Sequence, residues 1–384
     1  FASMWSGKVP TEIGAVTSID EADSKDNERV FVPAEIETLA ERLESEGYVT
    51  QAFANNFLLN EERGYAQGFE GFYNREDVRS WHWVGANQKV SMVKLWHRTP
   101  VLGKIVRGWY GRVVGETWQP WSRDEAKLIV NEGIEWLETR ESKEGVFLWM
   151  HLVDPHAPYK YHHEWGVEAD VEPRDILSLE HFENEKKMRL REVDKRAVFE
   201  LYEGEVRYTD RELGRFWSYL TESGWSDESV VIFTSDHGEE FWEHGNLGHV
   251  RSYYEETVNV PLMVKGVEFE EPEGELSLVD LKGAVLEMVD IRDNDLKSWF
   301  DEDYEDEAIW LDGDGWGPIR KGMREGFWKY IEDIDGNREL YNLLSDEEEQ
   351  INLAESFDFI SDRMSVNLNS FFEDFDFPRT AIDR

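Results

Sequence analysis

Two short segments of the chain carry side chains that could bind charged groups. Asp236 and His237 follow an apolar run at residues 230–234 after one serine, and Gly238 lets the backbone turn sharply behind them. A carboxylate beside an imidazole suits a divalent cation, because both are common ligands of such ions. Asp-His pairs also occur without any function, and two ligands do not complete a metal site. The position of this pair at the end of an apolar run is what favours a functional interpretation.

A second apolar run, residues 146–153, is followed by His156, which stands between two prolines. The prolines restrict the loop, and a histidine held in this way can bind an anionic oxygen or protonate a leaving group. The alternative is a histidine that only caps the end of a strand. His151, inside the run, is expected to be packed and hydrogen-bonded there.

Two more histidines lie in the glycine-rich segment 242–249. His244 and His249 follow the Asp-His pair closely enough in sequence to line the same cavity, where such a segment could cradle an anion. A solvated loop is the alternative.

The order of secondary-structure elements predicts how these segments are positioned. Both apolar runs are typical of strands that helices bury on both faces. A further strand is predicted at residues 49–53, and amphipathic helices at 35–46, 124–140 and 195–222. This alternation predicts an α/β domain with a largely parallel sheet, in which ligands bind at the carboxyl ends of the strands. The charged composition after residue 266 predicts a smaller C-terminal subdomain, residues 267–384.

The overall charge and the absence of cysteine exclude several classes of function. The 384 residues include 83 acidic and 41 basic side chains, for a formal net charge of −42. A surface this negative repels phosphate backbones, which excludes general nucleic-acid binding. Since the chain has no cysteine, it has no disulfides, thiol nucleophile, zinc–thiolate site or iron–sulfur cluster. No run of about 18 apolar residues predicts a transmembrane helix.

The same acidity is typical of a protein from a salty, haloarchaeal cytosol. At ~1 M salt the Debye length is about 3 Å, so the self-repulsion of an acidic surface becomes tolerable. Lysine is also scarcer than arginine, 16 residues against 25. We therefore predict a cytoplasmic protein that works at high salt. An ordinary acidic protein of a mesophile is the alternative.

Several stretches resemble the sulfatase family of the alkaline-phosphatase superfamily. The strongest are FTSDHGEEFWEHGNLGH at 233–249, YEETVNVPLMVKG at 254–266 and FLWMHLVDPHAPY at 147–159. Shorter matches follow in the family's order at residues 2–10, 39–48, 202–214, 328–331 and 339–354. The resemblance therefore covers nearly the whole chain, and ordered matches are more specific than any one alone.

The resemblance implies an alkaline-phosphatase-like α/β/α sandwich with a mostly parallel central sheet in residues 1–266. It implies a smaller α+β subdomain with a short antiparallel sheet in residues 267–384. The implied function is a hydrolase of sulfate monoesters that acts on a sulfated or phosphorylated small molecule or glycan. Such an enzyme uses one divalent cation, Ca²⁺ in most relatives, with Mg²⁺ or Mn²⁺ as the other candidates.

The family's site residues carry over only where the sequences match. Asp236 and His237 would be two ligands of the cation. His156 and His249 would be catalytic and bind sulfuryl oxygens, although many relatives have lysine where His249 stands. Two further candidates for substrate binding are His244 and Arg251.

Some features of the family are not matched. A strand with two more aspartate ligands and the nucleophile would precede Phe1, and Phe1 stands where the family's maturation motif has arginine. We therefore expect an N-terminally truncated sequence that is inactive by itself. A nucleophile other than formylglycine would make the protein a phosphatase or a phosphoglycerol-type transferase on the same scaffold. Loss of the nucleophile would leave a non-catalytic glycan- or lipid-binding relative.

One segment inverts the charge of the chain. Residues 75–112, within a predicted insertion of about 75–122, hold eight basic and two acidic residues together with four tryptophans. Tryptophan beside Lys and Arg is typical of contact with anionic lipid, and also of binding to a sulfated or phosphorylated glycan. Three interpretations stay open: a segment packed on the main domain, a lid over the substrate, and contact with a membrane surface.

The acidity leads to a direct test. We expect the full-length protein to fold only at high salt, because a net charge of −42 makes the compact state self-repelling at low ionic strength. Circular dichroism from dilute buffer to molar salt should show a cooperative gain of helical signal. A protein that is fully folded in dilute buffer would contradict the high-salt interpretation.

Overall fold

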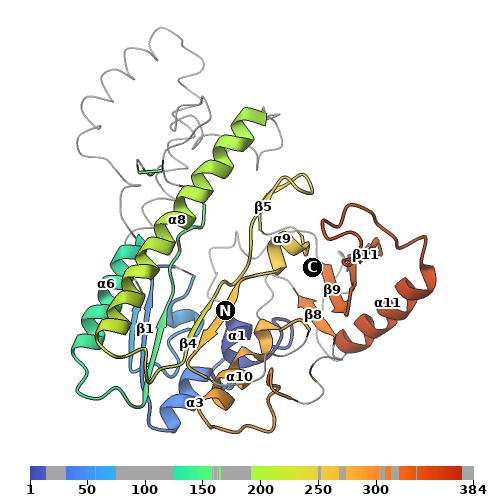
Figure 1. Ribbon diagram of the computed structural model, residues 1–384. Helices are drawn as coiled ribbons and strands as arrows, with labels where there is room; N and C mark the ends of the chain where they lie inside the picture. Colours follow the sequence, from blue (N-terminus) through green and yellow to red (C-terminus); the bar gives the residue numbers. More distant parts are fainter. Residues whose placement is uncertain are drawn as a thin grey trace.

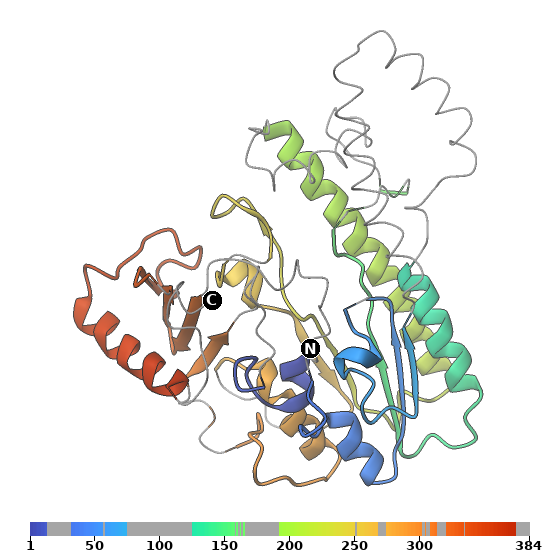
Figure 2. The ribbon, with the colours of Figure 1, turned by 180° about the vertical axis from the view of Figure 1, so that it is seen from behind.

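The computed structural model of the chain describes most of its length (Figures 1 and 2). The described residues are 1–13, 32–56, 58–74, 125–157, 159, 162, 164–165, 192–249, 252–267, 274–301, 304, 308–312, 320–333 and 335–373. The predicted insertion at about 75–122, including the basic segment 75–112, lies outside them, as does Arg251. Among the helices so described, none combines the length and apolar character needed to span a bilayer.

Helices and strands alternate through the first two thirds of the chain. The helices are α1 (Ala2–Ser6), α3 (Leu39–Ser45), α6 (Glu125–Glu138), α8 (Glu192–Glu222), α9 (Glu255–Val258), α10 (Leu281–Met288) and α11 (Asp358–Phe372), with 3-10 turns η1 (Glu61–Arg63) and η3 (Leu278–Asp280). The strands are β1 (Val49–Ala54), β2 (Gly71–Asn74), β3 (Val146–Met150), β4 (Val231–Thr234), β5 (Glu240–Phe241), β6 (Leu247–Gly248), β7 (Leu262–Lys265), β8 (Ile309–Asp312), β9 (Arg320–Glu325), β10 (Trp328–Asp333) and β11 (Arg338–Asn342).

A parallel sheet in the order β2-β1-β3 lies between two helical layers. Strand β3 is covered by helices on both faces, although its residues are half-buried rather than fully buried as the apolar sequence predicted. Leu148 packs with Leu137 of α6 and Leu220 of α8. On the opposite face, the ring of Trp149 contacts that of Trp5 in α1 at a centroid distance of 4.7 Å. The predicted α/β architecture with a parallel central sheet is therefore confirmed.

A capping box decides where α3 begins. Thr38 Oγ1 accepts a hydrogen bond from Glu41 N at 3.1 Å, and Glu41 Oε2 accepts one from Thr38 N at 2.8 Å. These two bonds satisfy donors that have no partner inside the helix. The helix therefore starts at Leu39, whereas the apolar spacing had predicted a start at residue 35.

Strands β4 and β7 pair with each other in antiparallel fashion, with Val231 opposite Lys265. The segment of β4 was predicted as a strand, but its antiparallel pairing with β7 was not. Ile232 and Val264 pack against the same apolar core as Trp149 of β3. This common core keeps the ends of β3 and β4 close together.

The described residues between 308 and 373 form what we call the C-terminal unit. Its four strands make an antiparallel sheet in the order β11-β10-β9-β8, and α11 covers one face of it. Met364 and Leu368 of α11 pack on Met323, Tyr330 and Leu340 of the sheet. The predicted short antiparallel sheet is confirmed, whereas the predicted boundary after residue 266 stays a prediction.

A buried cation joins the C-terminal unit to the rest of the chain. The side chain of Lys329, in β10, is 0 % exposed, and its Nζ lies 2.8 Å from Glu255 Oε1 and 2.9 Å from Glu349 Oε1. Glu255 begins α9, so this lysine connects that helix to the sheet. Burying a lysine is tolerated here because two carboxylates face it.

Replacement of Lys329 tests this junction. We expect Lys329→Ala to lower the free energy of unfolding by about 3–5 kcal/mol, because it leaves buried carboxylates without their cation. Urea unfolding at molar salt measures the loss. The matched control is Arg338→Ala, which removes an ion pair with Asp362 whose side chains are 40 % and 70 % exposed, and should cost no more than about 1 kcal/mol. Equal losses in both variants would contradict the assigned role of Lys329.

Candidate active site

The end of β4 places Asp236 and His237 in a tight turn against α9. Gly238 N donates a hydrogen bond to the carbonyl of Thr257 at 2.9 Å. A Cβ on Gly238 would stand 2.1 Å from the carbonyl oxygen of Glu256. Only glycine therefore lets this turn approach α9 so closely.

The loop after β3 is fixed by two buried polar side chains. Asp154 is 4 % exposed, and its Oδ2 accepts from Ala126 N at the start of α6 at 2.8 Å. Asn55, which follows β1, accepts with Oδ1 from Val153 N at 2.9 Å. Both bonds satisfy buried backbone donors, which would be costly to leave unpaired. They also hold the loop that carries His156.

Three histidines from separate loops come together, and we call them the histidine cluster: His156, His237 and His249. The ring centroid of His156 lies 5.1 Å from that of His249 and 6.4 Å from that of His237. The rings of His237 and His249 stack at 3.8 Å, with 21° between their planes. Asp236 adjoins the cluster, with Oδ2 3.6 Å from His237 Nε2. The structure thus brings together four residues that the sequence analysis singled out; their chemical roles are proposed below.

In each ring of the histidine cluster, Nδ1 faces an acceptor. The distances are 2.5 Å from His156 to the Ala157 carbonyl, 2.8 Å from His237 to the Gly238 carbonyl, and 3.2 and 3.3 Å from His249 to the two carboxylate oxygens of Glu239. Carbonyl and carboxylate oxygens only accept, so Nδ1 carries the proton in every ring. The remaining chemistry of each ring therefore belongs to Nε2.

Charges around the cluster are arranged in pairs. The Glu239 side chain is 6 % exposed and places negative charge behind the ring of His249. Desolvation opposes ionisation of Asp236, but electrostatic interaction with the neighbouring His237 and His151 side chains and a backbone hydrogen bond outweigh it and lower the pKa of Asp236 below its usual value. Asp236 is therefore an anionic carboxylate at neutral pH.

Asp236 and His237 are suitable types of ligand for a divalent cation, but two ligands are too few to complete a site. With its proton on Nδ1, a neutral His237 presents a lone pair at Nε2, 3.6 Å from Asp236 Oδ2. Ca²⁺ takes about six to eight oxygen ligands. Within the described stretches, no group of three or more His, Asp or Glu side chains could hold a metal. Asp236 and His237 alone therefore do not make up the expected site.

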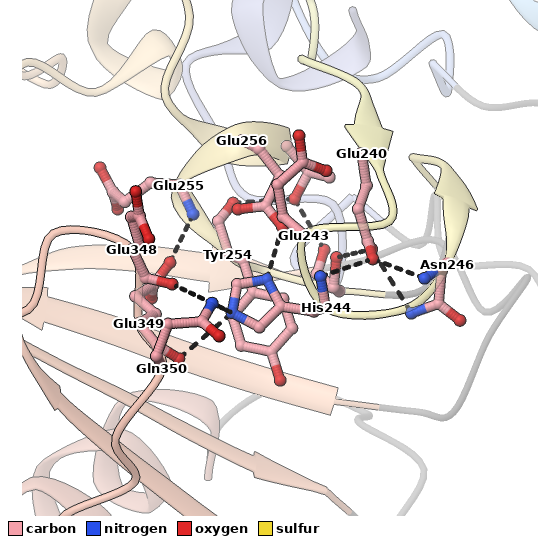
Figure 3. Close-up of polar contacts among 12 residues, drawn as sticks. Glu240, Glu243, His244, Asn246, Tyr254, Glu255, Glu256, Glu348, Glu349 and Gln350 are labelled. Atoms are coloured by element: carbon pink, nitrogen blue, oxygen red, sulfur yellow. Dashed lines mark hydrogen bonds and ion pairs between the residues drawn. The ribbon is translucent and has the colours of Figure 1, made fainter. Parts of the chain in front are cut away.

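His244 faces the C-terminal unit (Figure 3). Its ring stacks on Tyr254 at a centroid distance of 3.6 Å, Nδ1 lies 2.7 Å from Glu256 Oε1, and Nε2 lies 3.2 Å from the Glu349 carbonyl. Both ring nitrogens are thus engaged, which favours a structural role over the substrate-binding role expected from the sequence. The other expected substrate contact, Arg251, lies outside the described residues.

A comparison with family sequences decides which family this arrangement represents. The sequence model described as Sulfatase matches residues 1–291. The chain belongs to the sulfatase family. Its curated relatives include an arylsulfatase of Clostridium perfringens, 28 % identical over 169 residues that cover 38 % of this chain and 34 % of that protein. A choline-sulfatase of Rhizobium meliloti is 24 % identical over 286 residues, covering 61 % of this chain and 51 % of that protein. The chain thus matches about a third of the length of the first of these sulfatases and about half of the second.

Solved structures show the same fold. BT4656, in complex with its substrate D-glucosamine-2-N,6-O-disulfate, matches with a TM-score of 0.62 and 15 % identity over 97 % of this chain and 87 % of that chain. The phosphonate monoester hydrolase of Agrobacterium radiobacter matches with a TM-score of 0.62 and 16 % identity over 96 % and 86 % of the two chains. At this level of identity, the likeness establishes a sulfatase-type fold.

Three residues that position the histidine cluster were not identified from the sequence. Asp154 directly follows the predicted strand 146–153, and Asn55 lies two residues after the predicted strand 49–53; that placement was the available signal for both. Glu239 directly follows the Asp-His-Gly run, but its pairing with His249 depends on the turn made by β5 and β6. None of these contacts follows from residue type alone.

Proposed function

We propose that the protein hydrolyses sulfate monoesters, so that the bond between sulfur and the alcohol oxygen breaks and sulfate and an alcohol leave. The proposal is carried by the histidine cluster beside the ionised Asp236 in a chain of the sulfatase family. A sulfuryl group carries negative charge on its oxygens, and fixed N–H donors stabilise such charge as it develops.

His249 and His156, which are not expected to bind the cation, would have different roles toward the substrate. His249 would bind a sulfuryl oxygen through Nε2, and Glu239 behind it would compensate the positive charge of the ring. His156, which is exposed, would bind another oxygen or donate a proton to the leaving alcohol. Its Nδ1 bond to the Ala157 carbonyl would keep Nε2 aimed at the substrate.

The cation, the substrate and the location are parts of the same proposal. We propose Ca²⁺, with Mg²⁺ and Mn²⁺ as alternatives; Asp236 and His237 would be two of its ligands, and the others would come from outside the described residues. A sulfated small molecule or glycan is the proposed substrate, a choice supported by the disulfated glucosamine bound to BT4656. The acidity supports a high-salt cytosol as the location. Segment 75–112 stays a candidate for a lid or a membrane contact.

The test compares esters with leaving groups of different pKa. We expect the full-length protein, with Ca²⁺ at high salt, to hydrolyse aryl sulfates faster than the matching aryl phosphates. His249→Asn should lower kcat/KM by about 10²–10³-fold for all aryl sulfates, because one donor to the charged oxygens is lost. His156→Asn should lower it by about 10²–10⁴-fold for poor leaving groups and much less for good ones, because only poor leaving groups need the proton.

A histidine outside the cluster supplies the control. His162 pairs with Glu205 and stacks on Tyr208 of α8, so His162→Asn should leave kcat/KM within about threefold of the unmodified protein, since it touches no reacting group. Preference for aryl phosphates would favour the phosphatase or transferase alternative. Binding of a sulfated glycan without any turnover would favour the non-catalytic one. Equal losses in His156→Asn and His162→Asn would contradict the assigned roles.

A further inference from the structure

His249 directly follows a short hairpin, which is held together by the buried side chain of Glu240. Strands β5 and β6 pair Glu240 with Gly248, and we call residues 240–248 the hairpin. Glu240 is 0 % exposed, and its Oε1 accepts from His244 N at 3.2 Å and from Asn246 N at 2.7 Å. These bonds make the hairpin one rigid unit. Because His249 directly follows it, the position of the hairpin sets the position of that ring.

Contacts from His244 connect the hairpin to the C-terminal unit (Figure 3). Nδ1 of His244 lies 2.7 Å from Glu256 Oε1, which only accepts a hydrogen bond. Nε2 lies 3.2 Å from the Glu349 carbonyl, another acceptor, and 3.3 Å from the amide nitrogen of Gln350. A neutral ring protonated on Nδ1 donates to Glu256 and can accept from the Gln350 amide, but it leaves the Glu349 carbonyl without a donor, whereas an imidazolium donates to both acceptors.

The charges that face His244 also favour an imidazolium. They come from the hairpin (Glu240 and Glu243), from α9 and its N-cap (Glu255, Glu256 and Tyr254), and from the C-terminal unit (Glu348, Glu349 and Lys329). Lys329 lies between Glu255 and Glu349, so it offsets only part of this negative charge. A second positive charge beside Glu256 is therefore stabilising.

We infer that His244 is a positioning residue: as an imidazolium held between Glu256 and the C-terminal unit, it fastens the hairpin and so sets where His249 stands. The inference deepens the proposed function, on which it rests only for the identity of the anion at His249. The electrostatics agree with it. Burial opposes the charged ring, but the bonds to Glu256 and the Glu349 carbonyl outweigh that effect and raise the pKa of His244 above its ordinary value.

The sign of the pH dependence follows from this raised pKa. A group that binds its proton more tightly in the docked state stabilises docking fully at low pH, and the contribution is lost as pH rises through the docked-state pKa. Docking should therefore weaken as pH rises through the docked-state pKa of His244, which lies above the ordinary value for histidine. Each unit by which docking raises the pKa changes the docking equilibrium by about tenfold.

The experiment measures amide hydrogen exchange in the hairpin at a series of pH values, expressed as protection factors so that intrinsic exchange is removed. The Trp242 amide, which donates to the Asn246 carbonyl at 2.7 Å, is one reporter. In the unmodified protein, protection should fall severalfold as pH rises. His244→Gln should show low protection at every pH, and His244→Lys, which keeps a positive charge, should restore protection that no longer depends on pH.

Gln350→Ala is the matched control, because it removes a neutral neighbour of the same ring nitrogen and should keep the pH dependence. Protection in the unmodified protein that does not change with pH, or that equals the protection in His244→Gln, would overturn the inference. If the protein hydrolyses aryl sulfates, kcat/KM should follow protection in the four proteins. If it does not, the proposed function fails and the exchange data still decide the role of His244.

Discussion

The candidate site depends on the acceptors that hold Nδ1 of each clustered histidine. Two of these acceptors are the backbone carbonyls of the next residue in the chain, Ala157 for His156 and Gly238 for His237. The third is the carboxylate of Glu239, which faces His249. An imidazole held in this way has a fixed tautomer and orientation, so its Nε2 meets a substrate without reorganisation. The rings of His237 and His249 can stack closely because each has a carboxylate beside it. Asp236 lies beside His237, and Glu239 lies beside His249.

The loops can hold these rings only because the strands before them are rigid. Strand β3 is packed by helices on both faces, and buried hydrogen bonds of Asn55 and Asp154 continue that order into the loop. On the other side of the site, Gly238 lets the turn after β4 press against α9. Helix α9 is connected in turn to the C-terminal unit through Lys329. The C-terminal sheet therefore supports the site although it contributes none of the clustered histidines.

Local patterns predicted most of the elements and four residues of the site. Apolar runs predicted β3 and β4, and their carboxyl ends predicted the neighbourhood of Asp236, His237 and His156. Contacts between distant residues could not be predicted in this way. The glycine-rich surroundings of His244 predicted a residue that binds an anion. In the structure its ring instead contacts the carbonyl of Glu349, which lies 105 residues further along the chain. The start of α3 was missed for a different reason, because a cap rather than apolar spacing sets it.

The most direct test of the histidine cluster as the sulfate-ester site is anomalous diffraction from crystals of the full-length protein soaked with selenate and Mn²⁺. Selenate has the shape and charge of sulfate, and both ions can be identified by their absorption edges. The account predicts selenate against the Nε2 atoms of His156 and His249, with Mn²⁺ bound by Asp236 and His237. Selenate bound elsewhere while the histidine cluster stays empty would contradict it.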